Sequence, residues 1–395
     1  MRILFLSFYF QPDLSAGSFR NTALIEALKD ELPVGSQIDV ITTLPSRYSS
    51  FSVDAPKRET FEGLTINRIA LSAHKSGMLD QSHAFITFAR EAMKLCKSQD
   101  YDLVYASSSR LMTAALGALI ARKKGLPLYL DIRDIFVDTI KDVLSRKLVW
   151  ALKPFFSWVE CWTLSRAQKI NLVSGGFKQY FEPRYPGKYF SYFTNGIDQE
   201  FIDAQPQSSY VTKSDLPEVV YAGNFGEGQG LHSIIPDLAK HFEGRLKFKL
   251  LGDGGRKSQL EAALLARQVT NVELLSPVSR RELIDIYQKA DVLFLHLNDY
   301  DAFLKVLPSK IFEYAAVGKP IWAGVSGFAS DFLHEYVNNA AVFPPCDLEA
   351  AIHSFDQLSF KTQSRTEFVE HFSRESIMIE MAKDIISIYG NQPIE

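Results

Sequence analysis

The sequence is poor in cysteine, and it has neither a long apolar run nor an excess of positive charge. Its three cysteines, Cys96, Cys161 and Cys346, are odd in number and lack C-x-x-C spacing. This argues against a disulfide framework or a zinc site and fits a reducing cytoplasm. No stretch reaches the roughly 18 apolar residues needed to cross a bilayer. A net charge of −3 gives no global attraction for nucleic acid. We therefore expect a cytoplasmic protein with no nucleic-acid partner, either soluble or peripheral at the inner face of the plasma membrane.

The length and the alternation of apolar patterns predict two domains. A chain of 395 residues favours two domains over one. Strand-like runs such as Ile3–Phe8 alternate with helical ones, and the pattern restarts after a polar segment with two prolines, Asp203–Pro217. Two βαβ series predict an α/β protein with two doubly wound parallel sheets, whose ligands bind beyond the carboxyl ends of the strands. We expect domains at 1–202 and 203–375 that face each other across a cleft, with a final helix in 376–395 that packs back on the first domain.

A glycine-rich loop stands at the start of the second series. Residues 221–235 read YAGNFGEGQGLHSII, and they follow an apolar strand and precede a helical pattern. A strand, a glycine loop and a helix N-terminus form a common cradle for phosphate. The loop has no lysine or arginine, it lacks the G-K-[ST] ending of a P-loop, and its G-x-G-x-G core is not the Rossmann fingerprint. Taken alone, it is either a phosphate loop or a tight turn.

Two further segments support a phosphate site. LLGDGG at 250–255 is a second glycine turn between a strand and a helix, and PSKIFEYAAVGKP at 308–320 opens a helix with a proline and a lysine. A lysine at a helix N-terminus opposes the helix dipole, so Lys310 favours a nearby anion. Glu313 can pair with Lys310 or accept hydrogen bonds from a ribose. The alternative is a solvated helix with a salt bridge between these two residues.

In combination, these motifs resemble GT-B glycosyltransferases of the retaining family-four type, over most of the chain. Gly17 in QPDLSAGSFR matches the glycine loop after the first strand of that family. TNGID at 194–198 is similar to its N-G-x-D motif, and VYAGNFGEGQGL is similar to its G-x-x-x-x-x-K-G loop. LLGDGG matches its G-x-G turn, and PSKIFEYAAVGKP matches its E-x7-E helix.

The chain departs from the family pattern at three positions. The family usually has an arginine after the first loop glycine and a lysine before the last, where this chain has Asn224 and Gln229. The first glutamate of E-x7-E is replaced by Lys305. Our hypothesis is a relocated clamp, in which Lys310, with Lys305, neutralises a diphosphate while loop amides donate hydrogen bonds. Such substitutions are similar to those of a subgroup in bacterial O-antigen and capsule clusters that includes N-acetyl-fucosamine transferases.

The resemblance implies a reaction and a donor site. The reaction is retaining transfer of a sugar, such as the N-acetylated deoxysugar N-acetyl-fucosamine, from a UDP-sugar to an undecaprenyl-diphosphate-linked oligosaccharide. No metal and no cofactor besides the nucleotide-sugar substrate is implied, and no protein nucleophile is required. Lys310 would stabilise the departing diphosphate electrostatically. The implied donor-binding residues are Gly17, Gly223, Asn224, Gln229, Gly230, Gly252, Asp253, Gly254, Lys305, Pro308, Ser309, Lys310 and Glu313.

The first half supplies candidate acceptor groups at its strand ends. Three charged residues close an apolar strand at LDIRD, 130–134, which is unusual for a buried parallel strand. Either they form a loop with an internal salt bridge, or they contact a ligand. In the second case Asp134 is a candidate catalytic base. The candidate acceptor-binding residues are Arg20, Asp131, Arg133 and Ser174.

Two other segments carry weaker patterns. Val143–Trp162 holds three of the four tryptophans together with Arg146, Lys147 and Lys153. Such a segment either docks on an anionic membrane surface or packs in the core. Asp299-Tyr300-Asp301 formally matches the metal-binding D-x-D of another glycosyltransferase fold, and we interpret it as a polar loop.

Other classes of function remain open at this stage. Non-hydrolysing UDP-sugar 2-epimerases share the two-domain architecture and would consume UDP-GlcNAc without an acceptor. A non-catalytic nucleotide-sugar-binding protein would bind the donor without turnover. A periplasmic binding protein is a third possibility, but the N-terminus lacks a convincing export signal.

Overall fold

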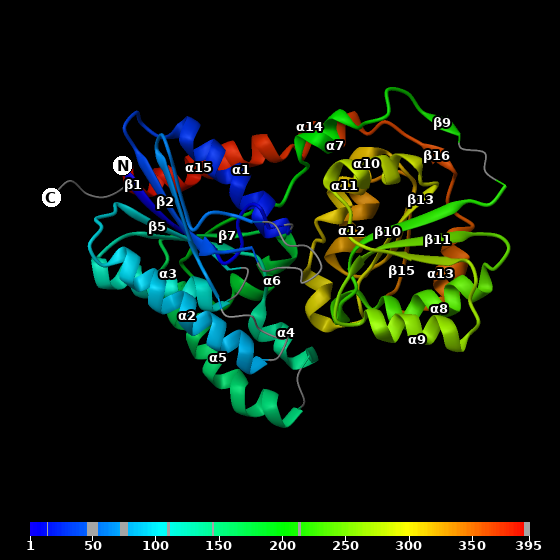
Figure 1. Cartoon of the computed structure of the whole chain (residues 1–395), viewed down its shortest axis with the longest axis horizontal. Helices are drawn as coiled ribbons and strands as arrows, with labels where there is room; N and C mark the ends of the chain where they lie inside the picture. The colour runs from blue at the N-terminus through cyan, green and yellow to red at the C-terminus, as the bar shows by residue number, and fades with distance from the viewer. Residues whose placement is uncertain are drawn as a thin grey trace. The chain divides into compact units, whose positions relative to one another are not determined.

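The computed structural model describes residues 1–13, 15–45, 54–71, 78–108, 111–143, 146–211 and 215–390. The chain forms two compact units (Figure 1). Unit 1 comprises Met1–Asn195 and the segment that begins at Arg374, and unit 2 comprises Gly196–Ser373. The division therefore falls after Asn195 rather than at the expected boundary between 202 and 203. The described residues of the polar segment 203–217 belong to unit 2, where β9 (Tyr210–Val211) pairs with β16 (Lys361–Thr362).

Unit 1 contains a sheet in the order β3-β4-β2-β1-β5-β6-β7-β8. The pairs are parallel except for the β3–β4 pair. The elements of unit 1 are β1 (Arg2–Leu6), α1 (Ala16–Glu31), β2 (Gln37–Thr43), β3 (Arg58–Phe61), β4 (Leu64–Ile69), α2 (Met78–Cys96), β5 (Leu103–Ser107), α3 (Leu111–Lys124), β6 (Leu128–Ile132), α4 (Phe136–Val143), α5 (Arg146–Arg166), β7 (Lys169–Leu172), a 3-10 turn (Gly175–Phe177), α6 (Lys178–Phe181), β8 (Tyr189–Ser191) and α15 (Arg374–Gly390).

Helices cover both faces of this sheet, which explains why its central strands are apolar on both sides. Ile3 and Phe5 of β1 pack with residues of α1 and α15 in one core, whereas α3 packs on β5 from the other face. Figure 1 shows α1 and α15 side by side, and α5 on the same side as α3. α5 packs on α3 and α4. No helix among the described residues has the length and apolar character that a bilayer span requires.

Unit 2 contains a parallel sheet in the order β12-β11-β10-β13-β14-β15. The elements of unit 2 are α7 (Gln199–Asp203), β9 (Tyr210–Val211), β10 (Glu218–Asn224), a 3-10 turn (Glu227–Gln229), α8 (Leu231–His241), β11 (Lys247–Asp253), α9 (Lys257–Ala266), β12 (Val272–Leu275), α10 (Arg280–Lys289), β13 (Val292–His296), a 3-10 turn (Asp301–Lys305), α11 (Lys310–Val317), β14 (Ile321–Gly324), α12 (Phe328–Tyr336), β15 (Ala340–Phe343), α13 (Leu348–Phe355), β16 (Lys361–Thr362) and α14 (Thr366–His371).

The alternation of side chains along β10 places one core on each face of this second sheet. Val219 and Tyr221 pack with α8, α9 and α13, whereas Val220 and Ala222 pack with α10, α11 and α12. The parallel strands end at one edge of the sheet, so the loops that follow β10, β11 and β13 meet there. The first two of these loops are the two glycine segments, and the third leads to α11.

Candidate functional site

The glycine loop of unit 2 runs from the end of β10 to the start of α8. Gly230 has φ 58°, in the left-handed region, and directly precedes α8. Gly223, at the end of β10, allows a close approach of another side chain. A Cβ atom on Gly223 would lie 2.6 Å from both Cε and Nζ of Lys310. The loop backbone and the Lys310 ammonium therefore share one small space.

Lys310 is the first residue of α11 and its side chain extends over β10. Its Nζ lies 5.9 Å from the centre of the Tyr221 ring, within the range of a cation–π contact. Burial lowers the pKa of the Lys310 ammonium, and the nearby Glu313 carboxylate partly offsets that effect. The structure thus brings together the lysine, the glycine loop and the start of a helix, which are the parts that an anion site requires.

The two positions where relatives usually carry cations contact each other. The side-chain amide of Asn224 donates to Oε1 of Gln229 at 3.0 Å. Both side chains are partly exposed. The loop is thus closed by a neutral amide pair, and Lys310 is the cation that lies against its first glycine.

The second glycine turn supports the first. A Cβ on Gly252 would lie 1.8 Å from the carbonyl oxygen of Gly223, and a Cβ on Gly254 would lie 2.6 Å from the Phe225 backbone. The Phe225 amide donates to the Asp253 carbonyl at 2.9 Å. Gly252, Asp253 and Gly254 therefore fix the position of the first loop through backbone packing.

A set of polar side chains holds the 3-10 turn of the loop. Glu227 forms an ion pair with Arg256 and accepts from the hydroxyl of Tyr300 at 2.6 Å. The hydrogen bond from Tyr300 is the main cause that lowers the pKa of Glu227. The side-chain amide of Asn298 donates to the Glu227 carbonyl at 2.9 Å, and its backbone amide donates to the Gly228 carbonyl at 2.8 Å.

His296 connects the glycine loop to the segment around Cys346 through hydrogen bonds. Its side chain is fully buried at the end of β13. The backbone amide of Cys346 donates to Nε2 at 3.0 Å, so this nitrogen carries no proton and Nδ1–H donates to the Gln229 carbonyl at 2.7 Å. Burial lowers the pKa of His296 to about 4. The imidazole is therefore a neutral bridge of fixed tautomer.

The remaining donor candidates lie around the start of α11. The carbonyls of Pro308 and Ser309 accept from the Ile311 and Phe312 amides at 3.1 and 3.2 Å, as expected for the first helical turn. Lys305 donates to the Asp301 carbonyl at 3.4 Å, within its own 3-10 turn. Its participation in the clamp therefore stays a prediction.

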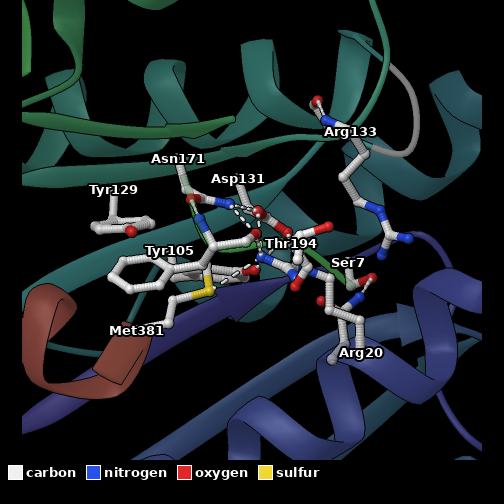
Figure 2. A network of polar contacts seen from close by, with 12 residues as sticks. Ser7, Arg20, Tyr105, Tyr129, Asp131, Arg133, Asn171, Thr194 and Met381 are labelled. Atoms are coloured by element: carbon white, nitrogen blue, oxygen red, sulfur yellow. Dashed lines mark hydrogen bonds and ion pairs between the residues drawn. The ribbon is translucent and has the colours of Figure 1, made fainter. Parts of the chain in front are cut away.

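In unit 1, Arg20 and Asp131 form a buried ion pair (Figure 2). Both side chains are fully buried, and Nε and Nη2 of Arg20 lie 3.0 and 3.1 Å from the two carboxylate oxygens. Arg20 also donates to the carbonyls of Thr194 and Phe193. Burial alone would raise the pKa of Asp131, but Arg20 and Arg133 hold it below its usual range. Neither residue has surface to offer an acceptor, so the expectation that they bind one is replaced here by a structural role.

Gly17 and Arg133 lie together at the start of α1. A Cβ on Gly17 would lie 3.2 Å from Nη1 of Arg133, and Figure 2 shows this guanidinium directed away from the buried pair. Nη1 is buried and has no hydrogen-bond partner within the part of the chain that the structure describes. Burial lowers the pKa of Arg133 to about 10, so the group remains a cation at neutral pH. Arg133 is therefore a cation held against Gly17, and the binding roles expected of these two residues stay predictions.

The last two candidates of unit 1 differ in exposure. Ser174 is buried and its hydroxyl accepts from the Gly176 amide at 3.2 Å, so it caps a turn rather than presenting a free surface. Asp134 is exposed and accepts from the hydroxyl of Thr139 at 3.3 Å. Its assignment as a catalytic base stays a prediction. Within the described residues, no cluster of three or more His, Cys, Asp or Glu side chains could hold a metal ion.

The fold defines the class of the chain. Two doubly wound parallel sheets of this topology are the GT-B fold, and solved GT-B glycosyltransferases match the chain over its whole length. Anabaena Alr3699/HepE in complex with UDP-glucose aligns with a TM-score of 0.68 at 15% identity, covering 98% of this chain and all of the other. WaaG, a glycosyltransferase involved in lipopolysaccharide biosynthesis, aligns with a TM-score of 0.65 at 12% identity, covering 99% and 96%.

Sequence comparison gives two further matches, the first of which lies in unit 2. Residues 205–373 match the family described as glycosyl transferases group 1. The chain is 32% identical over 108 residues to Escherichia coli (strain K12) WcaI, which is assigned to colanic acid biosynthesis as a glycosyl transferase. That match spans 26% of each protein, about a quarter of the relative's length. The family match and the fold together support a glycosyltransferase.

Sequence reasoning missed the residues that hold the loop from below. His296 and Asn298 follow the apolar run of β13 at the same sheet edge as the glycine loops, and this position was the available signal.

Proposed function

We propose that this protein is a retaining glycosyltransferase whose donor is a nucleoside diphosphate sugar, with UDP as the nucleoside diphosphate. The observation that carries the proposal is the position of Lys310 Nζ against Gly223 at the mouth of the glycine loop. A diphosphate in this space would receive a positive charge from Lys310 and hydrogen bonds from loop amides. The HepE complex with UDP-glucose supports a nucleotide-sugar donor for this fold.

The proposed reaction needs no covalent enzyme intermediate. The bond between the anomeric carbon and the diphosphate oxygen breaks, and a bond to the acceptor oxygen forms on the same face of the sugar. The acceptor proton passes to the departing diphosphate, which leaves as UDP. Because negative charge develops on the leaving group, the main catalytic contribution expected from this chain is electrostatic, through Lys310. Asp134 is the alternative proton acceptor.

The biological context is proposed from relatives. WcaI is assigned to colanic acid biosynthesis, and WaaG is involved in lipopolysaccharide biosynthesis. We extend this to an undecaprenyl-diphosphate-linked oligosaccharide as acceptor and to an N-acetylated deoxysugar, such as N-acetyl-fucosamine, as the transferred group. The destination would be O-antigen or capsule.

Calorimetric titration with UDP and with UMP, in the absence of metal, tests the donor site. We expect UDP to bind more tightly than UMP, and Lys310→Ala to weaken UDP binding by about ten- to a hundredfold, since a charged hydrogen-bond partner is lost. Glu313→Ala should also weaken binding. Lys289→Ala, at an exposed lysine that ends α10, is the matched control and should bind as the wild type does. Equal UDP affinity in Lys310→Ala and wild type would refute the clamp.

Turnover assays then separate the alternatives. Release of UDP that depends on a lipid-linked acceptor supports transfer. Consumption of UDP-GlcNAc without an acceptor supports a 2-epimerase instead. Tight binding of UDP-sugars without turnover on any lipid-linked acceptor supports a non-catalytic binding protein.

A further inference from the structure

α5 presents an apolar stripe to solvent. Its exposed positions include 147, 150, 151, 154, 155 and 158, which recur every three or four residues and therefore lie along one face. We call these residues the α5 stripe: Lys147, Trp150, Ala151, Pro154, Phe155 and Trp158. Trp150 is 83% exposed, Trp158 is 63% exposed and Phe155 is 52% exposed. Large aromatic side chains gathered in this way are unusual on a soluble protein surface.

The opposite face of α5 already supplies the packing that the fold needs. Val159 is buried and Phe156 is partly buried, and both pack with Leu111 of α3 and Val137 of α4. Phe156 also makes an edge contact with Phe136, with ring centres 5.0 Å apart. Sequence analysis left open whether this segment docks on a membrane or packs in the core, and α5 has apolar faces on both sides. The inner face packs in the unit, and the α5 stripe is left for another partner.

The charge around the α5 stripe indicates what kind of partner fits. Residues 146–159 contain an arginine, two lysines and no acid. The first acid of the helix, Glu160, is buried and accepts from the hydroxyls of Tyr180 and Tyr185. Lys153 lines one pocket together with Trp150, Ala151, Pro154 and Ser157, so its side chain adjoins apolar surface. This combination matches a phospholipid, which has an anionic headgroup above an apolar chain.

We propose that the α5 stripe docks unit 1 on the surface of an anionic lipid bilayer. Tryptophan prefers the boundary between headgroups and acyl chains, because its ring is apolar and its N–H needs a polar partner. Lysine stems can lie along the apolar surface while their ammonium groups reach phosphates. Helices of this composition lie in the interface plane rather than across the bilayer.

Pro154 supports a position of α5 at the membrane surface rather than inside the hydrocarbon. It lies inside α5 and on the stripe, and it has no N–H to donate to the carbonyl of Trp150, four residues earlier. A free carbonyl is costly in hydrocarbon but is easily satisfied by water at the headgroup level. This feature favours α5 resting on the surface. The inference stands apart from the proposed glycosyl transfer, because it concerns where unit 1 attaches and not what unit 2 binds.

Vesicle co-sedimentation of the full-length protein tests the proposal. We expect binding to vesicles that contain phosphatidylglycerol and little binding to pure phosphatidylcholine. Trp150→Ala combined with Trp158→Ala should lower the partition coefficient by about tenfold or more, because two large apolar side chains lose their burial. Lys147→Glu and Lys153→Glu should each lower it about fivefold, with the effect shrinking at high salt. Wild-type tryptophan fluorescence should shift to the blue on binding.

Matched controls distinguish binding through the α5 stripe from nonspecific adsorption to vesicles and from misfolding of the variants. Tyr189→Ala removes a side chain of unit 1 that is 75% exposed and lies outside the stripe, and Lys123→Glu reverses an exposed charge on α3. Both should bind as the wild type does, and circular dichroism should show unchanged melting for all variants. Absence of wild-type binding to anionic vesicles would overturn the proposal. So would unchanged binding after loss of both tryptophans, or self-association that the same two substitutions abolish.

Discussion

The side-chain amide of Asn224 bonds to the side-chain oxygen of Gln229 at 3.0 Å across the glycine loop. At these two positions, the GT-B glycosyltransferases that the sequence resembles usually have an arginine and a lysine. The pair leaves these two positions uncharged, while Lys310 lies against Gly223 from α11. Among the described residues, Lys310 is thus the cation placed against the first glycine of this loop.

Restoring the missing cations should strengthen donor binding. We expect Asn224→Arg combined with Gln229→Lys to tighten UDP binding by about tenfold or more, because each new charged hydrogen bond to phosphate is favourable. The gain should be larger for UDP than for UMP and should fall with rising salt. Calorimetric titration at two ionic strengths measures both effects. Unchanged affinity would mean that the two side chains do not reach the phosphates.

The close contact between the glycine turns should make Gly252 intolerant of a side chain. A Cβ there would lie 1.8 Å from the Gly223 carbonyl oxygen, and its φ is 150°. We expect Gly252→Ala to lower the free energy of unfolding by about 2–4 kcal/mol. Gly255, three residues on, has nothing within 4 Å of a Cβ, so Gly255→Ala should change stability by less than about 0.5 kcal/mol. Urea unfolding of both variants makes the comparison, and equal stability would contradict the packing described.

The buried ion pair of unit 1 should be costly to break on one side. Asp131→Asn leaves the fully buried Arg20 guanidinium without its counter-charge. We expect a loss of about 3–5 kcal/mol in unfolding free energy. Glu91→Gln, at an exposed ion pair with Lys94 on α2, should cost less than about 1 kcal/mol. Chemical denaturation checks both, and a small effect of Asp131→Asn would show that the pair is not isolated from water.

His296 should make stability depend on pH in a defined window. Its pKa is lowered to about 4 by burial, against an unfolded value of about 6.5. As the pH falls, the unfolded chain therefore takes up this proton before the folded chain does. The contribution of His296 to the free energy of unfolding is fully present above pH ~6.5 and is lost as the pH drops toward ~4, by about 3 kcal/mol in total. His296→Gln should flatten the pH profile of unfolding in this window. Substitution of the exposed His334 by Gln is the control and should leave the slope unchanged. An equal slope in His296→Gln and wild type would contradict the assignment.

Local patterns predicted much of the fold because they depend on neighbours in sequence. The apolar strand expected before the glycine loop is confirmed as β10. The Ser-x-x-Glu spacing at Ser279 and Glu282 likewise indicates the capping box that opens α10. The final helix expected in 376–395 is present as α15 and packs on α1. These features follow from periodicity and turn chemistry, which one sequence displays directly.

The relationships between distant residues could not be predicted in the same way. Arg20 and Asp131 are 111 positions apart, and nothing in either segment announces that they pair inside the core. The sequence therefore left Asp131 open between a salt bridge and a ligand contact, and it offered Arg20 only as a candidate for a ligand. His296 was missed for a related reason: its two partners, Gln229 and Cys346, are 67 and 50 positions away.

The chain crosses between the two units at neighbouring points, and this bears on how the units could be separated by protein engineering. Unit 2 begins at Gly196 and ends at Ser373, and the next residue from its start, Ile197, forms a β-bridge with Ser373. Unit 2 is thus an uninterrupted insertion whose entry and exit points are neighbours in space. Any excision or exchange of unit 2 would therefore need only one pair of junctions, after Asn195 and before Arg374.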